Sequence, residues 1–216
     1  MRKEIFGMLA AAAVVSLFAA SAAAADHNNA STVVYVAHLR PLNSNVTGSA
    51  ATGEAKFTIK GDSLTIQIDA EGLPPNIMHL QHFHGFTDNR QATCATAAAD
   101  KNGDGIVDLI ETEPMSGTTM VPFHDDPVNM QIANDTYPKA SAAGSYHYEK
   151  TVSLKALKAA FAKTFDDPDL ALDKRVVYIH TVPAATKLPA SVASLGKIPA
   201  QVTLPIACGE IKRVAR

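Results

Sequence analysis

Short segments of alternating apolar and polar residues, joined by turns instead of helices, restrict the fold of this chain most. Residues 33–39 have the composition of a strand, and residues 55–59 and 64–68 alternate on either side of a turn at residues 61–62. A further strand, rich in histidine, follows the turn-forming residues 72–75. Because alternation buries one face of a strand, and because successive strands without intervening helices pair antiparallel, the pattern predicts an all-β sandwich or barrel.

The second half of the chain predicts fewer regular elements. Residues 95–145 are rich in Ala, Gly, Asp, Thr and Pro with little periodicity, so they predict a long loop insertion. Ser153 has the character of an N-cap and predicts one short helix that ends near residue 164. Strands are expected at residues 146–152 and 176–180, and a last one within residues 202–214.

Residues 1–25 have the pattern of a secretory signal peptide. Arg2 and Lys3 precede an apolar stretch, and small residues at positions 23–25 offer a cleavage site. We therefore expect a periplasmic or secreted protein with a single β-domain at residues 26–216. No later stretch has the ~20 apolar residues that cross a bilayer.

The 19 basic and 21 acidic residues form no long run of one sign, which disfavours nucleic acid and membrane surfaces as partners.

Cys94 and Cys208 are the two cysteines of the chain. In an oxidising compartment, the default interpretation of such a pair is one disulfide. Closing so long a loop would stabilise the fold by ~4–5 kcal/mol on the chain-entropy model. Two free buried thiols, or two metal ligands, are the alternatives.

Three histidines lie close together after the second turn, at positions 79, 82 and 84. In an extended strand, successive side chains alternate faces, so His82 and His84 project from the same face about 7 Å apart. Imidazole is the commonest protein ligand for copper and zinc. The spacing therefore predicts a metal site, and the alternative is a group of polar residues on an exposed strand.

Residues 100–111 match the twelve-residue calcium loop of an EF-hand. Oxygen ligands fall at positions 1, 3, 5, 9 and 12, glycine stands at position 6, and position 7 offers a backbone carbonyl. The expected calcium ligands are Asp100, Asn102, Asp104, Ile106, Asp108 and Glu111. Because no second loop or pair of long flanking helices accompanies it, we expect a structural site that orders the insertion. An acidic loop without metal is the alternative.

The chain resembles the copper/zinc superoxide dismutases in three separated segments. The first is His79-Leu-Gln-His82-Phe-His84-Gly-Phe86-Thr-Asp88-Asn89, which leads to Cys94. The second is Arg175-Val-Val-Tyr-Ile179-His180, and the third is Ile206-Ala207-Cys208-Gly209-Glu210-Ile211. The segments occur in the family's order and leave the middle of the chain unlike it. The resemblance implies a Greek-key β-sandwich or barrel of the superoxide dismutase type, with the long insertion and one short helix.

The resemblance also implies roles for individual residues. Copper would be held by the residues that carry catalysis, His82, His84 and His180. His79 would brace one of these ligands from behind, and Cys94 and Cys208 would form the family's disulfide.

The remaining copper ligand of the family has two candidates in this chain. His124 and His147 are the histidines between Cys94 and His180. We favour His124 because a loop can bring a ligand inward, whereas His147 lies in an expected strand and can face solvent.

Two departures from the family bear on function. The histidine-rich zinc loop has no counterpart, so zinc is not expected, and the calcium loop occupies that part of the chain. The active-site arginine is replaced by Pro205, which cannot attract or hydrogen-bond an anion. Lys187 and Lys197 are candidates to replace its charge.

These observations predict an exported, copper-binding, superoxide dismutase-like protein with a structural calcium loop. As an oxidoreductase it would dismute superoxide to dioxygen and hydrogen peroxide at a zinc-free copper site. The alternatives are a non-enzymatic periplasmic protein whose partner is copper ions, and a calcium-stapled β-domain resembling the CHRD domains. The sequence leaves enzymatic activity and oligomeric state open.

Overall fold

The computed structural model describes residues 31–48 and 50–215, without the side chain of Val46. The expected signal peptide lies outside the described residues. The strands are β1 Thr32–Pro41, β2 Thr52–Lys60, β3 Ser63–Glu71, β4 Gln81–Gly85, β5 Thr118–Pro122, β6 Tyr146–Ser153, β7 Val176–His180, β8 Pro205–Glu210 and β9 Lys212–Arg213. The helices are α1 Ser44–Thr47, α2 Leu109–Ser116, α3 Leu154–Phe165 and α4 Ala200–Thr203, with 3-10 turns η1 Ala97–Ala99, η2 Pro127–Asn129 and η3 Leu172–Lys174. None of the helices in this part of the chain has the length and apolarity needed to span a membrane.

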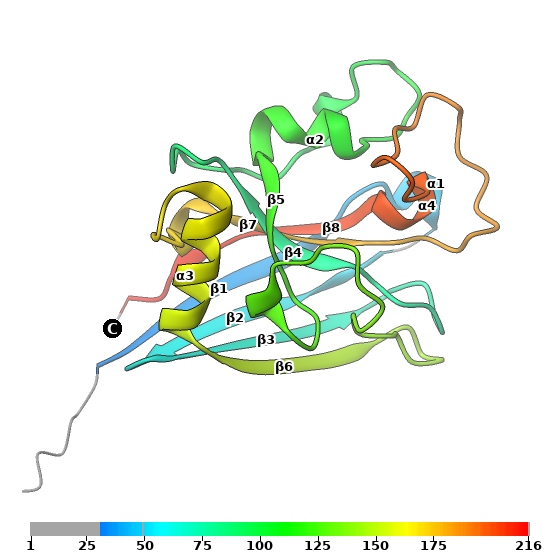
Figure 1. The fold of residues 1–216 in the computed structure, drawn as a ribbon. Coiled ribbons are helices and arrows are strands. Elements are labelled where there is room, and N and C mark those ends of the chain that lie inside the picture. The colour runs from blue at the N-terminus through cyan, green and yellow to red at the C-terminus, as the bar shows by residue number, and fades with distance from the viewer. Residues whose placement is uncertain (1–30, 49, 216) are drawn as a thin grey trace, which may run out of the picture.

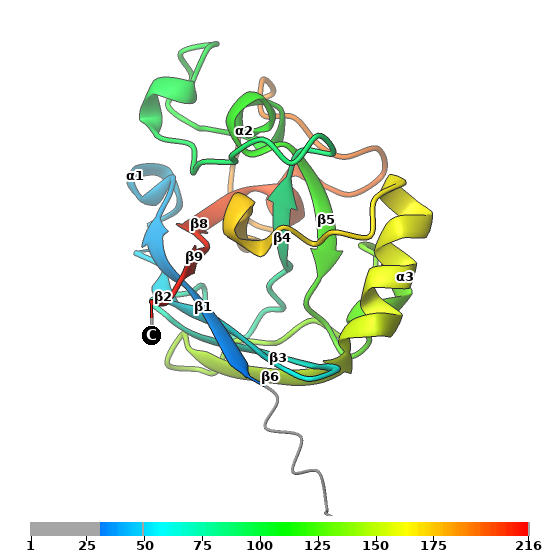
Figure 2. The same cartoon turned by 90° about the vertical axis from the view of Figure 1, so that its left-hand side faces the viewer.

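The strands pair antiparallel into one curled sheet. Their order is β5-β4-β7-β8-β1-β2-β3-β6, and β9 pairs with β1 outside this path. Figure 1 shows the sheet from the side, and Figure 2 shows it curling into a half-barrel around the core. The prediction of a mostly β, antiparallel fold is confirmed.

The hairpin of β2 and β3 follows directly from the alternating sequence. Its turn uses Gly61 at φ 58°, a left-handed conformation that favours glycine, and Lys60 pairs with Ser63. Phe57 and Ile66 pair across the strands, and both are fully buried. One face of the hairpin therefore lines the core, as period-2 alternation requires.

The helix α3 begins and ends close to the predicted bounds. The Ser153 hydroxyl accepts a hydrogen bond from the Ala156 amide at 3.1 Å, which is the expected N-cap. Phe161 of α3 lies with its ring centroid 6.3 Å from that of Phe83 in β4. The helix thus packs into the core beside the end strands of the half-barrel (Figure 2).

The long insertion contains more regular structure than its composition indicates. The expected loop at residues 95–145 includes α2 and the strand β5, which pairs with β4 at the end of the sheet. Likewise, the last expected strand, within residues 202–214, divides into the end of α4 and the strands β8 and β9. These elements are short, and long-range pairing determines them more than local periodicity does.

Candidate metal centre

Two neighbouring strands bring three histidines together. β4 pairs antiparallel with β7, so that His82 lies opposite Tyr178 and the His180 amide donates to the Leu80 carbonyl at 2.8 Å. The ligand atoms of His82, His84 and His180, which we call the histidine triad, all lie within 4.8 Å of one another. Each side chain is at most 3% exposed. The prediction of a histidine cluster able to hold a metal is confirmed, although the geometry does not identify the metal.

Two buried nitrogens of the triad have no hydrogen-bond partner. His180 Nδ1–H donates to the Thr203 carbonyl at 2.7 Å, which leaves the lone pair on Nε2 free. That Nε2 and the Nδ1 atom of His82 are buried without a partner. Buried polar atoms are almost always satisfied, so two such atoms in one histidine cluster suit the binding of a ligand. A metal ion would accept both lone pairs.

The third member, His84, is held by the edge strand. Its Nδ1–H donates to the Gly117 carbonyl at 3.3 Å, and its Nε2 lies 3.3 Å from the Thr119 hydroxyl. Gly117 has φ 71°, and a Cβ atom there would lie 2.0 Å from the Gly85 carbonyl oxygen. Glycine is therefore required for β5 to approach β4 this closely and to orient His84.

Burial keeps the triad neutral. Desolvation, with the neighbouring imidazoles, lowers the pKa of His82 well below its ordinary value of 6.5. Burial and the charge of His180 lower the pKa of His84 to about 3, and burial lowers the pKa of His180 to about 4. Metal ions bind the neutral form of imidazole, so the environment favours the binding-competent state.

The backbone beside the triad is strained, and a fourth histidine supports it. Thr181 follows His180 with φ 94°, which a β-branched residue rarely adopts. His79 is fully buried, and its ring nitrogens lie 2.9 Å from the carbonyls of His180 and Pro74. Burial lowers the pKa of His79, and these two carbonyls oppose that shift. The residue therefore contacts the backbone of His180 and lies outside the triad.

The structure does not bring His124 to the triad, contrary to our expectation for the last copper ligand. Its Nε2–H donates to the Gln131 carbonyl at 2.9 Å, and its Nδ1 accepts from the Asp126 amide at 3.1 Å. Both nitrogens are thus used within the residue's own loop. Its ring packs edge-on against Tyr137, with the centroids 5.0 Å apart.

His147 does not complete the triad either. It lies on β6, at the opposite end of the sheet order from β5 and β4. Its Nδ1 is 2.6 Å from an oxygen of Asp69, and its side chain is 56% exposed. The expectation that it can face solvent is met.

The expected calcium loop has the turns of its motif without a converged set of carboxylates. The Asp100 carboxylate accepts from the amides of Gly103 and Gly105, and the Glu111 carboxylate accepts from the Lys101, Asn102 and Asp108 amides. Within the described residues, the triad is the single group of three or more His, Cys, Asp or Glu side chains whose ligand atoms converge.

Asp108 of the calcium loop has structural partners. One carboxylate oxygen caps α2 through the Ile110 and Glu111 amides, and the other accepts from the Ala193 amide at 2.7 Å. Glu111 completes a capping box with the Asp108 amide. The loop is thereby attached to a segment that lies far from it in sequence.

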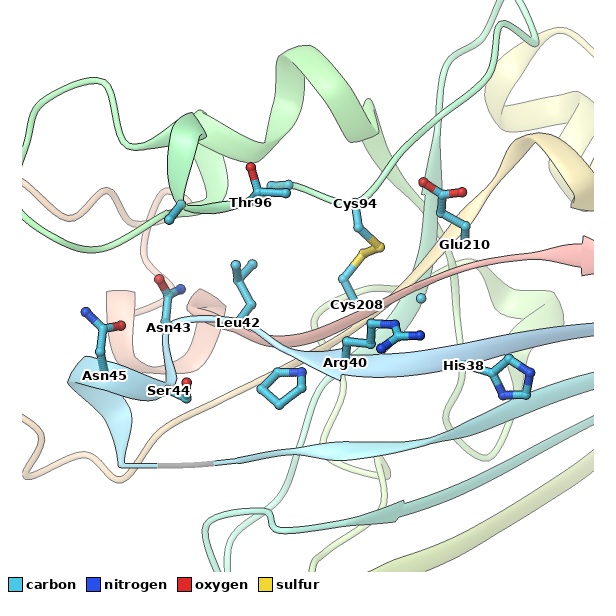
Figure 3. Close-up of a pocket in the computed structure, with 14 residues that line it drawn as sticks. His38, Arg40, Leu42, Asn43, Ser44, Asn45, Cys94, Thr96, Cys208 and Glu210 are labelled. Carbon is cyan, nitrogen blue, oxygen red and sulfur yellow. A yellow bond between two sulfur atoms is a disulfide. The ribbon is translucent and has the colours of Figure 1, made fainter.

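The predicted disulfide is present. Cys94 and Cys208 are bonded with their Cα atoms 5.8 Å apart. The bond borders a surface cavity of about 610 Å³ that includes Arg40 and Thr96 in its lining (Figure 3). None of the three triad histidines lines this cavity, so it is separate from the candidate metal centre.

The sequence analysis did not predict several residues that contact the triad. Thr119 was not predicted because β5 was not predicted. Thr203 contributes its backbone carbonyl, which no side-chain pattern reveals. Tyr178 could have been predicted from the sequence, since it precedes His180 by two residues on one strand and so shares its face. Its ring lies edge-on to that of His84 with centroids 4.9 Å apart, and its hydroxyl is 2.7 Å from that of Ser116.

No protein-family model matches the chain, and no curated protein matches it either.

Proposed function

We propose that this chain is a copper-binding protein that holds one copper ion at His82, His84 and His180. The observation that carries this proposal is the pair of unpartnered nitrogens, on His82 and His180, within a buried triad. Three neutral imidazoles without a thiolate suit copper or zinc, and copper(II) has the higher affinity for a given nitrogen site. The resemblance of three segments to the copper/zinc superoxide dismutases, without the zinc loop, also favours copper.

Metal analysis of purified protein tests the assignment. Copper and zinc would be supplied together, and the bound metals would be measured by mass spectrometry. We expect about one copper per chain and little zinc. Copper should be lost in His180→Ala and kept in His147→Ala, the matched change of an exposed histidine. Equal copper content in the two variants would contradict the assignment.

Superoxide dismutation is the reaction that the resemblance favours for this centre. Copper, when bound, would supply one-electron exchange, so that one superoxide is oxidised to dioxygen and a second, with two protons, is reduced to hydrogen peroxide. The chain would contribute the three imidazoles, with His79 supporting the backbone of His180. On this proposal, the half-barrel is a divergent Greek-key barrel of the dismutase type in an exported protein.

The arginine position weakens the case for fast dismutation. Pro205 pairs with His180 in the register of β7 and β8 and offers no hydrogen-bond donor. We therefore propose copper binding without catalysis as the second candidate function. Superoxide decay measured on the copper-loaded protein separates the two, because activity lost in His82→Ala supports the enzyme, and bound copper without activity supports a carrier or buffer.

The proposed calcium site at residues 100–111 has a separate test. Calorimetric titration of chelator-treated protein should give about one bound calcium. Glu111→Gln should weaken binding, whereas Glu113→Gln, which changes an exposed carboxylate on the same helix, should not. Calcium binding without copper binding would favour the remaining alternative, a calcium-stapled CHRD-like domain in which the histidines are structural.

A further inference from the structure

A very small cavity lies against two members of the triad. It is bordered by His82, His180, Thr119 and Thr203 and by the apolar side chains of Leu80, Leu109, Ile132, Leu195 and Ile198. Its volume is about 10 Å³, which is roughly the space of one water molecule. We call this cavity and its lining the mouth.

The mouth has no charged side chain in its lining. Lys187 and Lys197, the candidates to replace the missing arginine, are both exposed and do not line it. The hydroxyls of Thr119 and Thr203 are its polar side-chain groups apart from the imidazoles. An anion that enters such a mouth loses its water without gaining a cationic partner, and that desolvation opposes its attraction to a bound metal ion.

The outer wall of the mouth is anchored in place. Residues 191–198, which we call the strap, carry Leu195 and Ile198. The Ser191 hydroxyl donates to Asp104 at 2.5 Å, and the Ala193 amide donates to Asp108 at 2.7 Å. Between the two apolar residues, Gly196 turns the chain at φ 58°, and the Ile198 amide donates to the Leu195 carbonyl at 2.9 Å.

We propose that the mouth admits small uncharged molecules to the metal and excludes anions, and that Leu195 and Ile198 of the strap set this selectivity. The ligand class is a neutral molecule of two or three atoms, such as dioxygen. This inference rests on the proposed copper site, and it favours the second candidate, copper binding without dismutation, because superoxide is itself an anion. It assigns the side chains of Leu195 and Ile198 the role of selecting what reaches the triad.

Two probes of opposite kind test the selectivity on copper-loaded protein. Carbon monoxide, which is uncharged, would be added to the copper(I) form and followed by its infrared stretch. Azide, which is an anion, would be titrated into the copper(II) form and followed by its charge-transfer absorption and by electron paramagnetic resonance. We expect carbon monoxide to bind and azide to bind weakly.

A positive charge placed at the mouth should change the binding of the anion and not that of the uncharged ligand. Leu195→Lys should tighten azide binding by about tenfold or more, as expected for one added charge near the metal, and leave carbon monoxide binding unchanged. Val214→Lys is the matched control, because Val214 is 47% exposed and Leu195 is 46% exposed. It should leave both ligands unchanged. Ile198→Lys provides a second variant if the first folds poorly.

The outcomes are distinct. Azide binding that is equally tight in the wild type and in both strap variants would overturn the inference and leave the copper site intact. Failure of carbon monoxide to reach copper(I) while azide reaches copper(II) would also overturn it. A wild-type protein without copper would overturn the proposed function, and this inference with it.

Discussion

Arg175 places a guanidinium in the interior, where it joins the segment that follows β4 to the segment that precedes η3. The residue is 1% exposed, and its nitrogens donate to the carbonyls of Leu170 and Phe86 and to the side-chain oxygen of Asn89. A Cβ atom at Gly85 would lie 2.5 Å from the Arg175 side chain, so glycine makes room for it. The sequence showed the arginine within a resembling segment but not its partners, because backbone acceptors leave no pattern.

Replacing this guanidinium should destabilise the protein. Arg175→Lys leaves at least one buried acceptor unpaired, because an ammonium cannot reproduce the planar fork of donors. We expect the free energy of unfolding in urea to fall by about 2–4 kcal/mol. Arg213→Lys, at an exposed position of β9, should change it by no more than about 0.5 kcal/mol. Equal losses in the two variants would contradict this account.

The triad makes the stability of the copper-free protein depend on pH. The pKa of His84 is about 3 and that of His180 about 4, against 6.5 ordinarily, so between pH 6.5 and 4 the unfolded chain binds protons that the folded chain does not. Stability is therefore fully present above pH 6.5 and falls as the pH falls. From pH 7 to pH 5 we expect a loss of about 2 kcal/mol for each histidine that stays neutral when folded.

Urea denaturation at the two pH values measures this loss. His180→Gln should reduce the difference, because it removes one of the titrating groups. A copper-free protein whose stability is the same at pH 7 and pH 5 would show that the triad is not buried in the neutral form.

At the scale of elements, local patterns predicted those strands and helices that stabilise themselves locally. The β2–β3 hairpin and α3 carry their turn residue and cap in sequence, and both formed as expected. The strand β5 was not predicted from the sequence, because its five residues become a strand only by pairing with β4. The position of His124 was mispredicted for a related reason, since the acceptor for its ring lies in a loop whose path depends on tertiary contacts.

Asp108 joins two elements, and its removal should affect both. Asp108→Ala should lower the free energy of unfolding by about 1–2 kcal/mol through loss of the α2 cap. It should also speed hydrogen exchange of the Ala193 amide, which loses its acceptor. Ser153→Ala removes the cap of α3 and serves as the control, with a similar loss of stability and no change at Ala193. Unchanged exchange in Asp108→Ala would mean that the strap is held by other contacts.

At the scale of the whole molecule, the fold class was predictable and the sheet order was not. Alternation and the absence of helices between early strands indicated an antiparallel β protein. The neighbours β4 and β7, which create the triad, lie far apart in sequence, and nothing in either strand alone specifies the other. The resemblance supplied His180 as a partner of His82 and His84, and the structure brings these three together.

The disulfide stabilises this long-range arrangement. It closes a separation of 114 residues and ties the insertion to β8. Reduction, or the double change Cys94→Ala and Cys208→Ala, should lower the free energy of unfolding by about 4–5 kcal/mol on the chain-entropy model. Urea titrations with and without dithiothreitol measure the difference. A loss under about 1 kcal/mol would indicate that the reduced chain keeps much of the same constraint when unfolded.

The two hydrogen bonds that join the strap to Asp104 and Asp108 also have a consequence for ion binding. They connect the proposed calcium loop to the wall of the mouth, so an ion that changes the position of these carboxylates would also change the proposed copper site. Such a connection is reciprocal, because two ligands that bias one element alter each other's affinity by the same factor. On the two proposed sites, calcium would then change the affinity for copper, and copper would change the affinity for calcium by the same factor.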